Sequence, residues 1–365
     1  MGQDLKEALR KYNNGTADEQ EKKLVEQWYL SLQGDKPTAE ELDDALTQGQ
    51  AGLKKLYRAK PLPLYLKIAG IAAAIAIVFG IYRAAFHNNT STDVLAARDS
   101  IVPGQEVALL KSDNNEEIDL RNMDLGSSFV DNGLEFKKSE EGKIKVQALP
   151  GSETKITQHL IRTPKGGEFE VELPDGSVVK LNAETELYFH SDYNSTNRQV
   201  RLSGEALFDI QKSTKPFIVS SATQKVTVLG TKFNIKAYPN EKETITKLLR
   251  GSVKVANNRS AEEVILKPGE QLINSNNKMI LSTTANNKID WDNSEFTFNT
   301  KSAEQIMNDI ARWYNVEVVF ENPELKNITY SGTISRYTDF NKVLEVLEKT
   351  GSLKFETEGR KITVR

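Results

Sequence analysis

The sequence predicts a multi-domain protein: a small all-α head, one transmembrane helix, an all-β region and a C-terminal α+β domain. Three patterns support this prediction. Residues 68–82 ("IAGIAAAIAIVFGIY") form an uninterrupted apolar run, residues 101–290 alternate with a period of two, and the end of the chain repeats the order strand, helix, strand. The expected boundaries are 1–60 for the head, 64–86 for the membrane helix, 87–100 for a linker, 101–290 for the β region and 296–365 for the C-terminal domain.

The head is expected to be a unit of three short helices. Thr16 with Glu19, and Thr38 with Glu41, have the spacing of capping boxes, which begin helices. A helical unit of this size buries little apolar surface, so it is marginally stable alone. It is therefore either a small spacer next to the membrane or a unit whose apolar surface a partner protein covers. The candidate partner-binding residues are Leu24, Val25, Trp28 and Tyr29.

Residues 64–86 are long enough to cross a membrane, because a bilayer core of about 30 Å needs roughly 20 helical residues. The segment lacks the polar stripe expected of a helix packed on a soluble core. Basic residues gather before and at its start and are sparse after it: Lys54, Lys55, Arg58, Lys60 and Lys67, against Arg83 and Arg98. The positive-inside rule therefore predicts a single span with a cytoplasmic N-terminus. A cleaved signal peptide is not expected, since it would lie at the N-terminus.

Short hairpins follow one another in the β region. In residues 166–182 ("GGEFEVELPDGSVVKLN") a turn at 174–176 separates two alternating runs. The apolar positions of these runs are Phe169, Val171, Leu173, Val179 and Leu181. Stretches that begin at Gly104, Leu134 and Gly269 have the same layout. This pattern is typical of a β-sandwich and equally of a short β-solenoid, and alternation does not separate the two.

The C-terminal domain is predicted to be an internal duplication. Ser302 and Gln305 form a capping pair before its first helix. Apolar residues recur at an offset of 37 positions, which indicates two βα units with equivalent core positions. The pairs are Ile306 and Val343, Met307 and Leu344, Ile310 and Leu347, Val316 and Leu353, and Val318 and Phe355.

Catalytic and metal-binding patterns are missing from the sequence. The chain has no cysteine, which excludes disulfides and thiolate chemistry. His87, His159 and His190 lie far apart, without metal-ligand spacing, and no phosphate loop or nucleophile elbow occurs. We therefore expect no enzyme acting on an external substrate, no cofactor and no metal. The net charge of −3 gives no reason to expect direct binding of nucleic acid.

The chain as a whole resembles the FecR family of bacterial transmembrane anti-sigma factors, in the form with an STN-like C-terminal domain common among Bacteroidetes. The resemblance rests on strings in a fixed order, with a single span between head and tail. They are "RKYNNGTADEQEKKLVEQWYLSL", "TPKGGEFEVELPDGSVVKLNAETELYF", "RQVRLSGEALFDIQKSTKPFIVSSATQKVTVLGTKFNIKAY", "KLLRGSVKV", "LKPGEQL", "WYNVEV" and "YSGTI". One departure is "KSDNN" near residue 113, where the family pattern has an Asp-Gly turn.

This resemblance implies a regulator of transcription in the bacterial inner membrane, with a periplasmic C-terminus. The head would bind an extracytoplasmic-function (ECF) sigma factor. The tail would sense the loaded state of an outer-membrane TonB-dependent transporter by contacting its periplasmic signalling domain. Regulated proteolysis that ends with an intramembrane protease would release or activate the sigma factor.

Gly230 and Thr231 lie between two β-prone runs in "VLGTKFNI". Glycine at such a place usually marks a bulge or a close backbone approach, which is the purely structural interpretation. By resemblance, this bond is also a candidate for self-cleavage by an N-to-O acyl shift, with the Thr231 hydroxyl as nucleophile.

Two other classes of function remain open from the sequence. One is a membrane-anchored periplasmic module that binds glycan or peptide through its β region, for adhesion and without sigma regulation. The other is an envelope scaffold with no signalling output.

Overall fold

A computed structural model describes residues 11, 18, 20–23, 101–111, 117–149, 156–193, 198–275, 278–284 and 287–365. The chain separates into two compact units, Met1–Thr90 and Ser91–Arg365. The predicted span 64–86 and linker 87–100 lie outside the described residues. Within the described part of the chain, no helix has the length and apolar character needed to cross a membrane.

Only a short helical piece of the head, residues 20–23, is described. Asp18 and Glu21 cap it reciprocally. The Glu21 backbone N–H donates to Asp18 Oδ1 at 2.8 Å, and the Asp18 backbone N–H donates to Glu21 Oε2 at 3.0 Å. Aspartate, like threonine, is a favoured residue at the N-cap of a helix. Thr16 and Glu19 lie outside the described residues.

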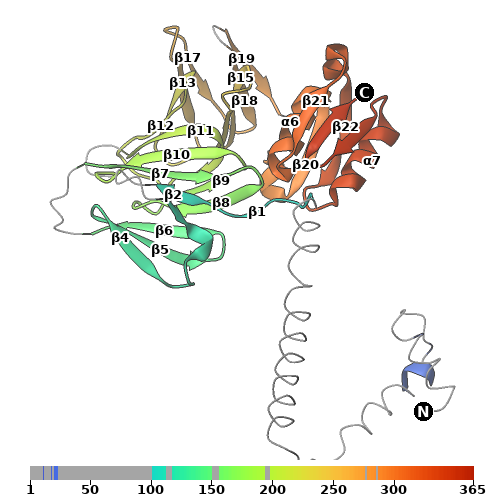
Figure 1. The fold of residues 1–365 in the computed structure, drawn as a ribbon. Helices are drawn as coiled ribbons and strands as arrows, with labels where there is room; N and C mark the ends of the chain where they lie inside the picture. Colours follow the sequence, from blue (N-terminus) through green and yellow to red (C-terminus); the bar gives the residue numbers. More distant parts are fainter. Residues whose placement is uncertain are drawn as a thin grey trace, which may run out of the picture. The chain divides into compact units, whose positions relative to one another are not determined.

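Two large sheets form the β region (Figure 1). The first sheet runs in the order β3 (Glu117–Asp119), β2 (Leu109–Lys111), β7 (Gln158–Thr163), β10 (Thr185–His190), β11 (Arg198–Asp209), β12 (Phe217–Ser220), β13 (Gln224–Val228), β16 (Val253–Asn257) and β17 (Glu263–Leu266). Its strands are antiparallel except for the β11–β12 pair. A short 3₁₀ helix, η1 (Leu120–Asn122), follows β3.

The second sheet runs in the order β4 (Ser128–Asp131), β5 (Leu134–Glu140), β6 (Lys143–Ala148), β8 (Gly167–Glu172), β9 (Val178–Leu181), β11, β14 (Lys232–Ala237), β15 (Glu243–Arg250), β18 (Glu270–Ser275) and β19 (Lys278–Thr283). The β6–β8 pair is parallel. The two-residue strand β1 (Gln105–Glu106) also pairs in parallel with the first residues of β8.

Strand β11 belongs to both sheets. Its first residues pair with β10 and β12, and residues 204–209 pair with β14. The change of sheet occurs at Gly204, whose φ is +113°. A Cβ atom at this position would lie 2.5 Å from Thr185 Oγ1. The bend therefore needs glycine, both for its backbone angle and for the close approach of β10.

One hydrophobic core joins the two sheets. It contains inward-facing residues of the first sheet, such as Leu187, and of the second, such as Val179. The hairpins alternate between the sheets: β12–β13 lie in the first, β14–β15 in the second, β16–β17 in the first and β18–β19 in the second. Because two sheets pack across one core, the β region is a sandwich, which decides between the two predicted architectures.

The C-terminal domain has the predicted α+β content. Its elements are β20 (Glu295–Ser302), α6 (Ala303–Tyr314), β21 (Glu317–Phe320), η3 (Pro323–Asn327), β22 (Thr329–Ser335), α7 (Phe340–Thr350), β23 (Phe355–Glu358) and β24 (Lys361–Val364), with η2 (Trp291–Asn293) just before them. Strands β20 and β22 form one antiparallel sheet. Strands β21, β24 and β23 form a second sheet, in which β21 and β24 are parallel.

The predicted duplication is visible in this core. The Gln305 backbone N–H donates to Ser302 Oγ at 3.3 Å, and Gln305 Oε1 accepts from the Ser302 backbone N–H at 3.1 Å, which confirms the capping box. Asp339 caps α7. The paired positions from Ile306 and Val343 to Val316 and Leu353 are buried, and Val318 and Phe355 pack against the same cluster. The repeated pattern therefore predicted equivalent core positions correctly.

Candidate functional site

The surface where α6 and the β22–α7 loop contact the β-sandwich contains several buried and partly buried charged groups. We call this surface the seam. The C-terminal domain contributes Asp309, Arg312, Trp313, Arg336 and Tyr337. The sandwich contributes Glu168, Asn182, Lys236, Tyr238 and Glu241.

Trp313, near the end of α6, lies at the centre of the seam and is only 1% exposed. Its indole Nε1–H donates to the backbone carbonyl of Arg336 at 2.7 Å. The Arg336 guanidinium lies over the indole, 3.6 Å from the ring centroid, and Tyr337 meets the indole edge-on at 5.7 Å. Trp313 thus connects α6 to the β22–α7 loop by a hydrogen bond, a cation–π contact and an aromatic contact.

Arg336 extends from this loop to the sandwich and is 2% exposed. Its Nη2 donates to Asn182 Oδ1 at 2.8 Å, and its Nη1 donates to the Trp291 carbonyl at 3.0 Å and to Glu168 Oε2 at 3.3 Å. Burial lowers the pKa of the guanidinium, and the nearby carboxylate of Glu168 opposes this effect. Because arginine stays protonated in proteins, the interaction places a buried positive charge against the sandwich.

A second charged cluster involves the same face of α6, because Asp309 and Trp313 are four residues apart in the helix. Lys236 Nζ lies 2.9 Å from Asp309 Oδ1 and 3.2 Å from Glu241 Oε2. Arg312 donates to Asp309 Oδ1 at 2.9 Å and also bonds Glu241. Its guanidinium lies 3.8 Å from the ring centroid of Tyr238. Two cations and two carboxylates therefore alternate across the contact.

Burial opposes charge on Lys236 and Asp309, yet the attraction of the neighbouring charges outweighs it. Burial by itself lowers the pKa of Lys236, but the charges of Asp309 and Glu241 raise it overall. Burial by itself raises the pKa of Asp309, but Lys236, Lys301 and Arg312 hold it well below its usual range. Lys236 and Asp309 are thus favoured in their charged forms in a low-dielectric setting, where removal of one partner leaves an uncompensated charge. Such a network favours one position of the C-terminal domain on the sandwich over other positions.

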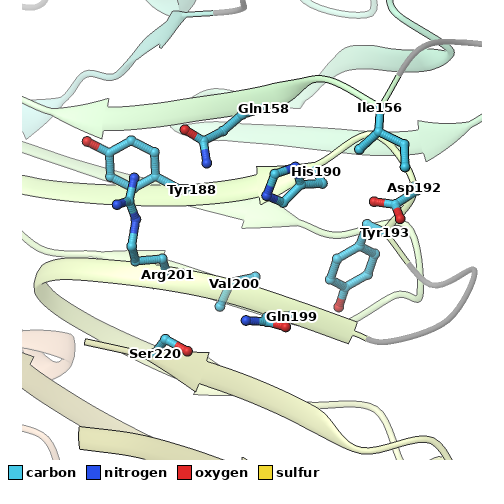
Figure 2. A pocket seen from close by; sticks show the side chains of 10 residues that line it. All are labelled: Ile156, Gln158, Tyr188, His190, Asp192, Tyr193, Gln199, Val200, Arg201 and Ser220. Atoms are coloured by element: carbon cyan, nitrogen blue, oxygen red, sulfur yellow. The ribbon is translucent and has the colours of Figure 1, made fainter. Parts of the chain in front are cut away.

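A groove of about 480 Å³ lies elsewhere, on the outer face of the first sheet (Figure 2). The Arg201 guanidinium lies 3.9 Å from the centroid of the Tyr188 ring, and the Tyr188 hydroxyl donates to Glu186 at 2.8 Å. The groove is lined by Ile156, Gln158, Tyr188, His190, Asp192, Tyr193, Gln199, Val200, Arg201 and Ser220. Its mixture of amide, imidazole, carboxylate and hydroxyl groups can exchange hydrogen bonds with a polar ligand.

The Gly230–Thr231 bond lies in the connection from β13 to β14. Thr231 is 1% exposed, and its hydroxyl donates to the Ser252 carbonyl at 3.0 Å. A Cβ atom on Gly230 would lie 2.7 Å from Lys212 Cα, so the chain approaches closely here, as predicted for glycine. A Cβ atom on Gly251, whose φ is +97°, would lie 2.8 Å from Thr231 Oγ1 and 3.0 Å from the Gly230 carbonyl oxygen. The nucleophile and the carbonyl of the candidate cleavage reaction therefore face the same glycine.

The predicted partner-binding residues Leu24, Val25, Trp28 and Tyr29 lie outside the described residues. In the part of the chain that the structure describes, no group of three or more His, Cys, Asp or Glu side chains could hold a metal ion. Of the predicted site residues, the structure therefore places only Gly230 and Thr231.

The seam is absent from the sequence-based predictions. Arg336 lies in "TISRYTDF", where an arginine between a strand and a helix looks like a solvated loop residue. Lys236 and Arg312 are polar residues in alternating or helical patterns, where the exposed face is expected. One residue could have indicated a contact with another domain: Trp313 in "WYNVEV". It lies outside the repeated core positions, so residues from elsewhere are needed to bury it.

Comparison with protein families gives two matches. The model described as "FecR protein" matches residues 159–254, within the sandwich, and the model described as "FecR, C-terminal" matches residues 295–364. A comparison with curated proteins gives no match.

Solved structures provide a further likeness. Two crystal structures of a candidate anti-sigma factor from Parabacteroides distasonis ATCC 8503, at 1.65 and 2.50 Å resolution, are each 28% identical to this chain with a TM-score of 0.53. They cover 56% and 57% of this chain and 98% of their own chains. The tail thus contains regions that match the two domains of the FecR family, in their order along the sequence.

Proposed function

We propose that this protein is a single-pass anti-sigma regulator of the bacterial inner membrane. Its cytoplasmic head binds an ECF sigma factor, and its periplasmic tail relays the loaded state of a TonB-dependent outer-membrane transporter. The observation that carries the proposal is the tandem of FecR and FecR C-terminal domains, together with the likeness to the candidate anti-sigma factor from Parabacteroides distasonis.

The first test addresses the sigma factor. The full-length protein, extracted in mild detergent, is expected to capture an ECF sigma factor from its own cells. Trp28→Ala should weaken binding by about 2 kcal/mol or more if Trp28 is a central anchor of the interface. Tyr57→Ala, an aromatic substitution in the same head outside the candidate face, is the matched control. Unchanged capture by the Trp28 variant would remove Trp28 from the interface, and capture of no sigma factor would contradict the proposal.

The second test addresses the transporter. We propose that its signalling domain adds to an edge strand of the C-terminal domain. Strand β21 ends the three-stranded sheet, and its Val319 is 37% exposed. Deletion of 296–365 should uncouple sigma activity from nutrient while the protein stays in the membrane.

A point variant tests the contact more sharply. Val319→Asp should weaken the nutrient response, because a charge on the edge strand opposes pairing with an apolar partner strand. Val346→Asp on α7 is the matched control, since Val346 is 38% exposed but lies on a helix. A normal response in the Val319 variant would place the contact on another surface.

We further propose that proteolysis carries the signal, in steps that end with an intramembrane protease acting on 64–86. Self-cleavage at Gly230–Thr231 is one candidate step. The Thr231 oxygen would attack the Gly230 carbonyl carbon, the C–N bond would break with its nitrogen taking the hydroxyl proton, and water would hydrolyse the resulting ester.

Protein tagged at both ends should then give two fragments that divide at residue 230. Thr231→Ala should abolish the division, and Thr231→Ser, which keeps a hydroxyl, should retain it. A single intact band under signalling conditions would exclude self-cleavage and leave the structural interpretation of the glycine.

A second candidate function is periplasmic binding of glycan or peptide, and the groove around Tyr188 and Arg201 favours it. Thermal-shift measurements on the full-length protein with a panel of saccharides and peptides would test it. A shift that Arg201→Ala abolishes supports ligand binding at the groove, whereas no shift with any member of the panel contradicts it.

A further inference from the structure

The segment that leads from the predicted membrane span into the tail passes through the seam. We call residues 101–107 ("IVPGQEV") the strap. The strap lies between the start of β8 on the sandwich and the end of α6 on the C-terminal domain, and it touches both. The two domains therefore hold one short stretch of chain jointly.

The attachment of the strap to the sandwich is short. Only two residue pairs join β1 to β8, Gln105 with Gly167 and Glu106 with Glu168. The Gln105 backbone N–H donates to the Gly166 carbonyl at 2.8 Å, and that of Val107 donates to the Glu168 carbonyl at 3.0 Å. Two parallel pairs are a weak hold by themselves, because stable strand addition usually uses a longer ladder.

The C-terminal domain also contacts the strap and keeps it in place. A Cβ atom on Gly104 would lie 2.5 Å from Cε3 and Cζ3 of Trp313, so the strap backbone lies directly against the indole. Ile101 packs against the core of the C-terminal domain. The Gly166 backbone N–H donates to the Arg312 carbonyl at 2.7 Å, which ties the end of α6 to the residue that also binds Gln105. Displacement of α6 would therefore remove the indole and the helix end that keep the strap in place.

We infer that the strap is an endoproteolytic site, which the C-terminal domain holds closed when it is docked and releases when it moves away. An endopeptidase needs several residues of extended backbone free of other pairing, and a paired segment offers this only after local opening. When Trp313 leaves Gly104, the strap is held by its two pairs to β8 and by contacts of Glu106 and Val107 with the sandwich, and it opens more readily. The peptidase then adds water across one peptide bond of the strap, which separates the membrane-proximal chain from the whole tail. This inference rests on the proposed function for its role in signalling, but the opening of the strap does not depend on a sigma factor or a transporter.

The first experiment measures the opening on purified full-length protein in mild detergent. A glutamate-specific endopeptidase cuts after Glu106, and mass spectrometry detects the new N-terminus at Val107. Trp313→Ala should accelerate this cut by at least about tenfold, because the strap loses a contact that holds it closed. Thr350→Ala, which changes the equivalent position on α7, should leave the rate unchanged.

A second cut separates local opening from unfolding of the sandwich. Glu243 lies in β15, a strand paired on both sides, so cleavage after it reports on the integrity of the sandwich. Accelerated cleavage at Glu106 with unchanged cleavage at Glu243 supports the strap. Equal acceleration at both sites, or no acceleration at Glu106, overturns the inference.

The last experiment tests the signalling role in cells with an engineered disulfide. The chain has no cysteine, so Glu106→Cys with Glu168→Cys forms a single pair at registered positions of β1 and β8. This lock should abolish nutrient-dependent loss of intact protein, and reductant should restore it. Ala256→Cys with Glu263→Cys, registered on β16 and β17, is the control and should respond normally. A locked protein that still loses its tail overturns the signalling role, whereas a control protein that never responds to nutrient contradicts the proposed proteolytic relay instead.

Discussion

Helices α6 and α7 occupy equivalent places in the two halves of the C-terminal domain, yet among the contacts of the described residues only α6 docks on the sandwich. Their inward faces match, since Ile306, Met307 and Ile310 correspond to Val343, Leu344 and Leu347, all buried. Their outward faces differ at three positions offset by the same 37 residues. Asp309, Arg312 and Trp313 of α6 correspond to Val346, Lys349 and Thr350 of α7.

The side chains at these corresponding positions also differ in how exposed they are. The Arg312 side chain is 4% exposed, while the Lys349 side chain is 71% exposed and pairs only with its helix neighbour Glu345 among the contacts described. The comparison teaches that the repeated apolar residues encode the fold of each half. A few polar and aromatic residues outside the repeat decide which half binds the sandwich.

The largest expected effect is that of Trp313→Ala. It removes a fully buried indole that contacts Gly104, Arg336 and Tyr337, and truncation of a buried tryptophan typically costs about 3–5 kcal/mol. Thermal unfolding of the full-length protein should show a separate early transition of the C-terminal domain. Thr350→Ala should leave the curve unchanged, and equal destabilisation by both variants would remove the distinction between the two helices.

A smaller loss of stability is expected for Arg312→Ala, about 3 kcal/mol, because it leaves the partly buried carboxylates of Asp309 and Glu241 with Lys236 as their main remaining partner. Lys349→Ala on α7 should have no measurable effect, since surface ion pairs contribute little. The same unfolding assay measures both. A double variant, Lys236→Met with Arg312→Ala, should be less stable than additivity predicts if the four groups act as one network.

The smallest expected effect is that of mild acid. The folded-state pKa of Asp309 lies below its unfolded value of about 3.9, so its contribution to stability is fully present above that value. It is lost only as the pH falls through the lower folded-state pKa. The seam should therefore be equally stable from pH 5 to pH 8 and weaken below about pH 4. A marked loss of the C-terminal transition between pH 7 and pH 5 would contradict this account.

Local rules predicted much of the tail from the sequence. The alternation of Phe169, Val171 and Leu173 gave the β8–β9 hairpin, because each face of a strand is either buried or exposed. The Ser302–Gln305 capping box and the 37-residue repeat likewise gave both helices and their inward faces. These features depend on neighbours within one or two elements, which the sequence shows directly.

Long-range features could not be predicted in the same way. The burial of Arg336 depends on Asn182 and Glu168, which lie 154 and 168 residues away in the chain. Nothing in the local pattern of an arginine shows such partners. Similarly, alternation described the strands of the sandwich equally well for a solenoid, because the choice depends on which hairpins face each other across the core.

The shared strand β11 has a mechanical consequence for the tail. The N-terminal half of β11 pairs within one sheet and its C-terminal half pairs within the other. Neither sheet can therefore slide past the other without breaking hydrogen bonds of this strand. The sandwich therefore resists shear between its two sheets. When the C-terminal domain is displaced, we therefore expect the pairing of β1 with β8 to open first, because only two residue pairs form it.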